Sequence, residues 1–378
     1  MTNPTITFAG GPIFDGETLR DGHAARFVDG GLIAIVAETE LSSGEAVEDL
    51  SGDILSPGYV DLQVNGGGGV MFNDDPSVET LRCIAMAHRQ LGATSILPTL
   101  ITDTPEKTTA AISAATQAIQ NGVQGIAGLH LEGPHLSGRR KGAHDGALIR
   151  PMEDADLKQL LAAAKALPAL MVTLAPESVT PAQVETLAKA GVIVSLGHSD
   201  ASFETCMAYM QAGAHCATHL FNAMSQLGNR EPGLVGAVLA SGAMSAGLIA
   251  DAIHVHPETM RAALAAKQGP GRLFLVSDAM AVAGTELTEF QLEGRIIQRE
   301  NGRLTLQDGT LAGADLDLAT ALRVLTTKVG VSLPEALAAA TRIPADLIAQ
   351  NTISRLNTVS QAIRISPDLS QARPVVKT

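Results

Sequence analysis

The sequence is poor in aromatic residues and in cysteine, and both deficits narrow the class of protein. It has no tryptophan, and aromatic residues make up 3% of the 378 positions, so a large core has to be built from aliphatic side chains. Hydrophobic residues still amount to 46%, which is enough for such a core and argues against disorder. The three cysteines, Cys83, Cys206 and Cys216, are widely spaced and odd in number, so no disulfide framework is expected.

Basic residues are also scarce relative to acidic ones. The chain has 26 Lys and Arg against 39 Asp and Glu, which gives a net charge of −13. Because an acidic surface repels phosphate backbones, and because the sequence has no long Lys/Arg cluster, we expect no nucleic acid partner. A small anionic substrate would need a local cationic pocket.

Long apolar runs are missing as well. No uncharged apolar stretch reaches about 18 residues, the length typical of a membrane helix. The opening residues, MTNPTITFAGGPIFDG, contain neither a basic segment nor a long apolar run, so they do not resemble a secretory signal. We therefore expect a soluble cytoplasmic protein without a membrane partner.

The remaining pattern divides into β-rich ends and a long alternating middle. From Ile54 onward, apolar strand candidates alternate with amphipathic or Ala-rich helices such as Pro105–Gln120 and Asp154–Ala166. The predicted strands are Gly58–Val64, Ser95–Leu100, Gly125–Leu131, Leu170–Leu174, Val192–Leu196, His215–Thr218, Ala246–Ile249 and Leu273–Val276. This alternation is typical of a parallel (β/α)8 TIM barrel. A doubly wound open sheet is the alternative, but no GxGxxG follows the first strand.

Two further segments complete the predicted domains. Residues Thr285–Thr310 predict β-hairpins with turns at Glu293-Gly294 and Asn301-Gly302, and helices are expected at Asp315–Val329 and Leu333–Ala340. We assign residues 57–345 to the barrel. Residues 1–56 and 346–378, from the two chain ends, are expected to form a small β-sandwich domain together.

Chemically capable side chains follow directly after the predicted strands. Glu132 follows the third strand, His198 the fifth, His219 the sixth and Asp278 the eighth. In a barrel all strand ends face one mouth, so these side chains would meet there. One carboxylate and two imidazoles are a known catalytic zinc ligand set, and a nearby Asp can act as general base.

Each of these residues also has an ordinary reading when it is taken alone. Glu132 fits a solvated turn, His198 and His219 fit capping or core positions, and Asp278 fits a turn cap. His144 lies in a basic loop, RRKGAHDGALI, that either covers an anionic ligand or is simply solvated. The joint placement of one Glu, two His and one Asp at four strand ends favours a metal site.

Long strings around these residues resemble the N-acetylglucosamine-6-phosphate deacetylases of the amidohydrolase superfamily. They run in the family's order from Pro57 to about Leu316: PGYVDLQVNGGGG, LHLEGPHLSGRRKGAH, SLGHSDA, ATHLFNAM, NREPGLVGAVL, LIADAIHVHP, LVSDAM and LAGADL. The resemblance implies hydrolysis of N-acetylglucosamine 6-phosphate to glucosamine 6-phosphate and acetate by a metal-dependent barrel.

The resemblance also implies roles for the residues around the metal. Glu132, His198 and His219 would bind one divalent metal ion per chain, and zinc is the expected ion. Asp278 would be the catalytic acid and base, and His144 would help to polarise the acetyl carbonyl.

The same resemblance implies contacts to a phosphorylated amino sugar. The main chain of Asn222 and Ala223 would bind the sugar phosphate together with the side chains of Arg230 and His254. In the family, Arg230 and His254 would reach across a subunit interface, so we expect a homodimer with a shared active site. Leu311 would line the acetyl side of the pocket.

Two segments depart from the family pattern. The usual HxH after the first strand is replaced by Gln63-Val64-Asn65. Because an amide oxygen is a poor zinc ligand, we predict a single ion, with Gln63 hydrogen-bonding around the site. The closing segment, NTISRLNTVSQAIRISPD, lacks the glycine-containing turn and the Ala-Asp pair that family members usually have.

Two other functions stay open. Another amidohydrolase reaction, on a different N-acetyl sugar or a deamination, would not need the phosphate contact that Arg230 and the preceding NAM segment favour. A non-catalytic sugar-phosphate binding protein would be expected to have lost Asp278 or a metal ligand, and none is missing.

Overall fold

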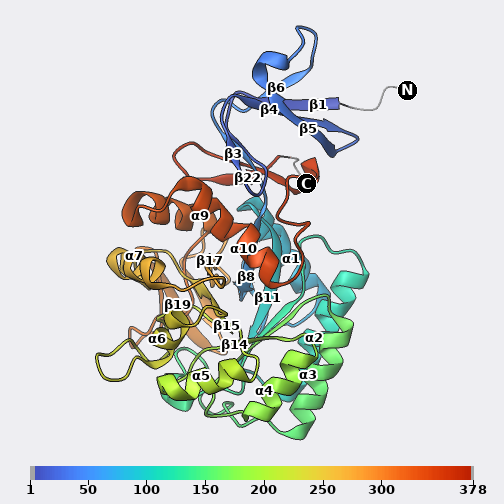
Figure 1. Ribbon diagram of the computed structural model, residues 1–378. Helices are drawn as coiled ribbons and strands as arrows, with labels where there is room; N and C mark the ends of the chain where they lie inside the picture. Colours follow the sequence, from blue (N-terminus) through green and yellow to red (C-terminus); the bar gives the residue numbers. More distant parts are fainter. Residues whose placement is uncertain (1–4, 376–378) are drawn as a thin grey trace.

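An eight-stranded parallel sheet forms the centre of the protein (Figure 1), in a computed structural model that describes residues 5–375. Its strands are β8 (Tyr59–Val64), β11 (Ala93–Ile101), β12 (Leu129–Glu132), β13 (Leu170–Leu174), β14 (Ile193–Leu196), β15 (Cys216–Ala217), β16 (Ser245–Leu248) and β17 (Leu273–Leu275). Each strand pairs in parallel with the next, and a parallel bridge between Val64 and Ala279 joins the two edges. The predicted (β/α)8 barrel is confirmed, and the open sheet is excluded.

Helices surround this barrel (Figure 1). They are α1 (Val78–Gln90), α2 (Pro105–Gln120), α3 (Asp154–Ala166), α4 (Pro181–Lys189), α5 (Phe203–Gln211), α6 (Gly233–Ala240), α7 (Pro257–Ala266), α8 (Leu318–Val324), α9 (Leu333–Ala340) and α10 (Arg342–Leu347). The starts of α2 and α4 follow the prediction because Thr104 and Thr180 cap them, each ahead of a proline in the first turn.

Three helical details differ from the prediction. Helix α6 was missed because all of it except Ala240 is buried, so it has no amphipathic period to detect. Helix α10 was missed because it follows α9 directly and contains Pro344. The helix predicted over Asp315–Val329 starts only at Leu318, where Asp317 caps it, and its last five residues form a π-helical turn, η3 (Leu325–Val329).

A small β-sandwich, built from strands near both ends of the described chain, stands at one end of the barrel (Figure 1). One sheet contains β1 (Thr5–Ala9), β4 (His23–Val28), β5 (Gly31–Ala37) and β6 (Val47–Asp49). The other contains β2 (Ile13–Phe14), β3 (Leu19–Arg20), β7 (Ile54–Pro57), β21 (Ala362–Ile365) and β22 (Ala372–Pro374). Phe8, Phe27, Leu55 and Leu356 are buried in one cluster between them. The sandwich from both chain ends is confirmed, while the boundaries at residues 57 and 345 stay a prediction.

The atypical closing segment is part of this sandwich. Strand β21 pairs antiparallel with β7, with Ile363 opposite Ser56 and Ile365 opposite Ile54. Ala362, Ile363 and Ile365 are fully buried. Strand β21 therefore packs on both faces, with Ile363 and Ile365 in the barrel core and Ala362 in the core of the sandwich.

A three-stranded antiparallel sheet, β18 (Glu289–Leu292), β19 (Arg295–Glu300) and β20 (Arg303–Thr305), lies beside the barrel mouth. Its turns fall at Glu293-Gly294 and Asn301-Gly302, as predicted, and all four residues have positive φ, between 51° and 76°. Buried side chains of this sheet share a small core with Met280, two residues beyond Asp278.

Two short strands, β9 (Gly66–Gly67) and β10 (Val70–Met71), follow β8. None of the helices between residues 5 and 375 has the length and apolarity that crossing a bilayer requires.

Candidate active site

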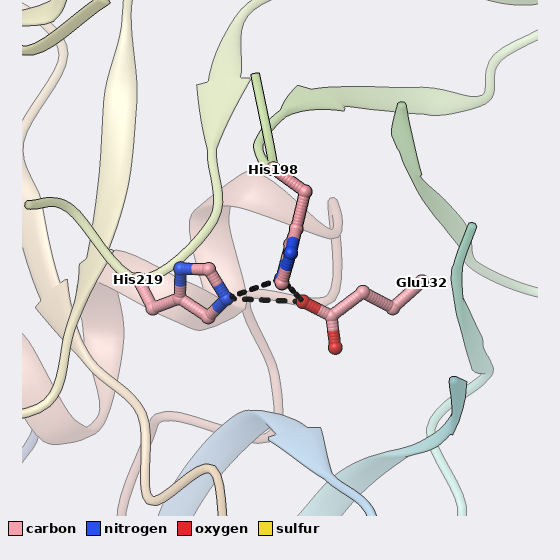
Figure 2. Close-up of side chains that lie close together, drawn as sticks. All are labelled: Glu132, His198 and His219. Atoms are coloured by element: carbon pink, nitrogen blue, oxygen red, sulfur yellow. Dashed lines mark hydrogen bonds and ion pairs between the residues drawn. The ribbon is translucent and has the colours of Figure 1, made fainter. Parts of the chain in front are cut away.

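Glu132, His198 and His219 meet at the carboxyl ends of the barrel strands (Figure 2). Oε1 of Glu132 lies 3.1 Å from Nε2 of His198 and 3.1 Å from Nε2 of His219, and the two nitrogens are 3.0 Å apart. All three residues are at most 4% exposed. Within residues 5–375 they are the one group of three or more His, Cys, Asp or Glu side chains whose ligand atoms all approach within 4.8 Å. The structure thus brings together the predicted metal ligands.

The chemistry of this cluster fits a divalent cation. Nδ1 of His198 lies 2.8 Å from the carbonyl oxygen of Arg140. Because a carbonyl can only accept, Nδ1 carries the proton and Nε2 directs its lone pair at Glu132 and His219. Burial raises the pKa of Glu132, but the interactions of its carboxylate with the His198 and His219 side chains outweigh burial and hold that pKa well below the ordinary value. A buried carboxylate facing two imidazoles is a site where a cation offsets the cost of burial.

The backbone turns sharply where these side chains leave their strands. His198, His219 and Asp278 have φ values of 47°, 32° and 51°, in the left-handed region that non-glycine residues rarely adopt. Each comes two or three residues after its strand ends, at Leu196, Ala217 and Leu275. The strained turns direct the side chains into the mouth, which is typical of functional positions.

Asp278 is tied to the cluster by two amides. Its Oδ1 accepts hydrogen bonds from Nδ2 of Asn65 at 2.7 Å and from Nε2 of Gln63 at 3.1 Å. Nε2 of Gln63 also lies 3.3 Å from both carboxylate oxygens of Glu132. Burial, followed by the negative charge of Glu132, raises the pKa of Asp278 to about 6. The amides that replace the HxH pair therefore serve as hydrogen-bond donors here.

His144 faces the same cavity in one defined tautomer. The backbone N–H of Thr102 donates to Nδ1 of His144 at 3.3 Å, and the Thr102 hydroxyl lies 2.8 Å from the same nitrogen. Because a backbone N–H only donates, Nδ1 accepts and the proton resides on Nε2. Burial lowers the pKa of His144 to about 3, so the ring is a neutral donor at neutral pH.

These groups open onto a cavity of about 520 Å³. Asn222, Ala223, His254 and Leu311, all predicted from the sequence, line it together with the cluster. His254 was expected to reach the site across a subunit interface, but it lines the cavity of its own chain, where its Nδ1 lies 2.6 Å from Oδ2 of Asp251.

Two predicted residues do not line the cavity. Gln63 is buried and, as expected, hydrogen-bonds to groups of the site, namely Glu132 and Asp278. Arg230 is exposed on the loop between Gln226 and Glu231 and does not line this cavity, so a single chain does not place it at the site.

Two contributors were not predicted, Thr102 and the main chain of Arg140, while Asn65 was predicted only as an amide after the first strand, without a role of its own. Thr102 directly follows β11, just as Glu132 ends a strand and the two histidines follow strands. Its position at a strand end is therefore a sequence signal from which it could have been predicted. Asn65 is separated from Asp278 by 213 positions, and only closure of the barrel brings the pair together. A main-chain acceptor such as Arg140 leaves no residue-type signal at all.

Comparison with known proteins agrees with this geometry. Residues 54–356 match the model of the Amidohydrolase family. The chain is 45% identical over 330 residues to an N-acetylgalactosamine-6-phosphate deacetylase of Shewanella sp. (strain ANA-3), covering 86% of this chain and 83% of the relative. It is 37% identical over 336 residues to an N-acetylglucosamine-6-phosphate deacetylase of Haemophilus influenzae, covering 88% and 86%.

A solved structure agrees over nearly the whole chain. The crystal structure of N-acetylglucosamine-6-phosphate deacetylase from Pasteurella multocida superimposes with a TM-score of 0.90 at 31% identity and covers 97% of both chains. The chain therefore belongs to the amidohydrolase family, within the group of amino-sugar 6-phosphate deacetylases that its sequence resembles.

Proposed function

We propose that this protein hydrolyses N-acetylglucosamine 6-phosphate to glucosamine 6-phosphate and acetate. The observation that carries the proposal is the convergence of Glu132, His198 and His219 with Asp278 in one buried cluster at the barrel mouth. The names of the relatives supply the substrate class.

The metal centre is the first part of the proposal. Glu132, His198 and His219 would hold one divalent ion, and this ligand set favours zinc. When bound, such an ion acidifies water and polarises a carbonyl. Gln63 and Asn65 support a single ion because their amide nitrogens donate to Asp278. Metal analysis of dialysed protein should find one ion per chain, and two fully occupied ions would contradict this.

Asp278 is suited to move the proton. Its Oδ1 is occupied by the two amide donors, so Oδ2 is the oxygen left to accept a proton from the attacking water. The same oxygen then returns this proton to the amine nitrogen as the C–N bond breaks, because an amine leaves only after protonation. A pKa raised to about 6 suits a group that both takes and gives a proton near neutral pH.

His144 would act on the acetyl carbonyl. Its Nε2–H is the donor left free by the contact between Thr102 and Nδ1, and its neutral state persists because burial lowers its pKa. A donor fixed before the reaction stabilises the negative charge that develops on the carbonyl oxygen. Leu311, with Ile101, Met280 and Leu292, supplies apolar wall for the acetyl methyl group.

The phosphate would be bound at the other side of the cavity. The N–H of Asn222 already donates to the carbonyl of His219 at 2.9 Å, so the N–H of Ala223 is the main-chain donor we assign to the phosphate. His254 lines the cavity of its own chain. Arg230 would contribute only from a second subunit, so a homodimer with a shared site is part of the proposal. A charged sugar phosphate does not cross membranes unaided, which supports a cytoplasmic location.

N-acetylgalactosamine 6-phosphate is the second candidate substrate. The relative named for that epimer is 45% identical, against 37% for the one named for the glucose epimer. Acetate release should be measured from both epimers, each with and without the 6-phosphate, on one metal-analysed preparation. We expect the phosphorylated glucose epimer to be hydrolysed best. A higher kcat/KM for the galactose epimer would make N-acetylgalactosamine 6-phosphate the substrate in place of the glucose epimer. Equal rates with and without the 6-phosphate would overturn the proposed class of phosphorylated substrates.

A further inference from the structure

We propose that the ion pair between Arg140 and Asp200 positions His198 and thereby sets the affinity of the metal site. Neither residue is a metal ligand or touches the reacting atoms in the function proposed above. The inference rests on that function in one respect, namely the role of His198 as a metal ligand.

Arg140 contacts the ligand and its anchor at the same time. Its carbonyl oxygen accepts the Nδ1–H of His198 at 2.8 Å. Its Nε and Nη2 donate to Oδ1 of Asp200 at 2.9 Å and 2.7 Å. Asp200 lies two residues beyond His198, so Arg140 binds the same short segment twice, through its carbonyl at His198 and through its guanidinium at Asp200. The guanidinium holds in place the carbonyl that fixes the imidazole.

Asp200 is itself anchored to the neighbouring barrel loop. Oε1 of Glu177, which follows β13, accepts from the backbone N–H of Asp200 at 2.6 Å. Oε2 of Glu177 accepts from the hydroxyl of Ser199 at 2.8 Å. The Asp200 carboxylate that Arg140 binds is therefore held in place by the Glu177 loop. The ion pair between Arg140 and Asp200 in turn restricts the movement of the Arg140 carbonyl.

The Arg140 loop also packs directly on the His198 ring. Ser137 N–H donates to the carbonyl of His198 at 2.9 Å. Gly142 lies so close that a Cβ at this position would be 3.4 Å from Cε1 of His198. Without the ion pair, the segment 138–142 would keep one hydrogen bond to His198 but lose the side-chain anchor in its centre.

The two histidine ligands differ in what supports them. Nδ1 of His198 has the Arg140 carbonyl, whereas Nδ1 of His219 is buried and has no hydrogen-bond partner within the described part of the chain. A partner on Nδ1 fixes the tautomer and makes the opposite nitrogen more basic. Of the two histidine ligands, His198 is therefore the one with a hydrogen-bonded Nδ1, and loss of the ion pair would act on it.

The test compares zinc affinity in matched variants. Arg140→Met and Asp200→Asn each remove one side of the pair, and Lys141→Met removes one charge from an exposed neighbour as the control. Zinc dissociation constants are measured by competition with a chromophoric chelator, starting from zinc-loaded protein. We expect affinity to fall roughly 10- to 100-fold in the first two variants, the range typical when support of a ligand is lost. The zinc affinity of Lys141→Met should stay within about twofold of wild type. The double variant Arg140→Met/Asp200→Asn should bind zinc no more weakly than the weaker-binding single variant.

A second readout separates positioning from general damage. The imidazole ¹⁵N shifts of His198 in zinc-loaded protein should change in Arg140→Met and stay as in wild type in Lys141→Met, while thermal unfolding of the metal-free proteins checks that each variant folds. If a variant does not fold, Arg140→Lys and Asp200→Glu replace it, with a smaller loss expected because the charges remain.

Two negative results have different meanings. Folded variants with the zinc affinity of Lys141→Met would overturn the positioning role alone. Wild-type protein that binds no ion would overturn the proposed function, and the positioning role with it.

Discussion

At the scale of single residues, the burial of Asp278 decides what this carboxyl group can do. It is 8% exposed, and burial with the nearby charge of Glu132 raises its pKa to about 6. Most aspartates stay ionised far below this value, so they accept protons poorly at neutral pH. The same environment that makes ionisation costly makes this group able to shuttle a proton.

Asp278→Asn tests that role. The substitution keeps the shape of the side chain but removes the oxygen that would carry the proton, so turnover should fall about 100-fold or more. The metal should remain bound because Asp278 is outside the three-ligand cluster. Steady-state assays on metal-analysed protein check both points. Wild-type turnover with the metal in place would show that another group moves the proton.

His88 should make the fold sensitive to acid. Its ring is buried, with Nε2 2.9 Å from the carbonyl of Gly66, and burial lowers its pKa from 6.5 to about 4. The unfolded chain therefore takes up a proton at higher pH than the folded one. The stabilisation is complete above pH 6.5 and is lost as the pH falls from there through about 4.

His88→Gln removes this titration and keeps a donor for the Gly66 carbonyl. Between pH 7.5 and pH 5, the unfolding free energy of wild type should fall by about 2 kcal/mol more than that of the variant. Urea unfolding at both pH values measures the difference. His88 does not line the active-site cavity, so metal effects cancel in the comparison. Equal pH dependence in the two proteins would assign the acid sensitivity to other groups.

At the scale of elements, the sequence predicted what local periodicity and caps determine. Helices α2 and α3 begin and end where expected, because Thr104 with Pro105 and the acidic turn at Glu153 mark their starts. Strand β11 is buried at all nine positions and reads as an apolar run, as strands covered on both faces do. The fully buried α6 escaped detection for the converse reason, since its apolar surface has no polar face to set a period.

The sequence predicted the site residues that follow or end a strand. It did not predict the contacts between residues of different strands. Glu132, His198, His219 and Asp278 all follow or end strands, and the barrel topology alone brings them together. The hydrogen bond from Asn65 to Asp278 depends on closure between the first and last strands, which the sequence does not specify in register. The exposed position of Arg230 depends on loop conformation, for which no periodic signal exists.

The sheet β18–β20 should act as a support for the His144 loop. Nη2 of Arg295, on β19, donates to the carbonyl of Ala143 at 2.7 Å and to Oε2 of Glu293 at 2.9 Å. Ala143 directly precedes His144, so loss of the hydrogen bond from Arg295 to the Ala143 carbonyl should move the imidazole of His144. We expect Arg295→Met to lower kcat roughly 10- to 100-fold, the scale of small misplacements, without changing zinc affinity.

Arg303→Met is the matched control for this prediction. Arg303 lies on β20 of the same sheet and is exposed, so the variant loses the same charge without touching the His144 loop. Measured kcat and zinc affinity should both stay close to wild type. If Arg295→Met and Arg303→Met have the same kcat, the sheet does not support the loop.

At the scale of the whole molecule, the single chain leaves one part of its predicted site incomplete. An acidic protein with a net charge of −13 needs local cations for a phosphate. Arg230 is the predicted phosphate contact that does not line the cavity of its own chain. Arg230→Ala should lower kcat/KM for the phosphorylated sugar roughly 30-fold or more, because losing one partner of a close charge pair costs about 2 kcal/mol or more. Hydrolysis of the unphosphorylated sugar is the control and should change little.

Subunit mixing tests whether Arg230 acts from the partner chain. If each site needs its own Asp278 and the Arg230 of the other subunit, a dimer of one Arg230→Ala chain and one Asp278→Asn chain has one intact site and one doubly defective site. Random pairing of equal amounts makes half of the dimers mixed, so about a quarter of the wild-type sites should be active with phosphorylated substrate. The variants are mixed, subunit exchange is confirmed with differently tagged chains, and acetate release is compared with each variant alone. Confirmed exchange without recovered activity would mean that Arg230 serves its own chain or none, and the shared site would have to be abandoned.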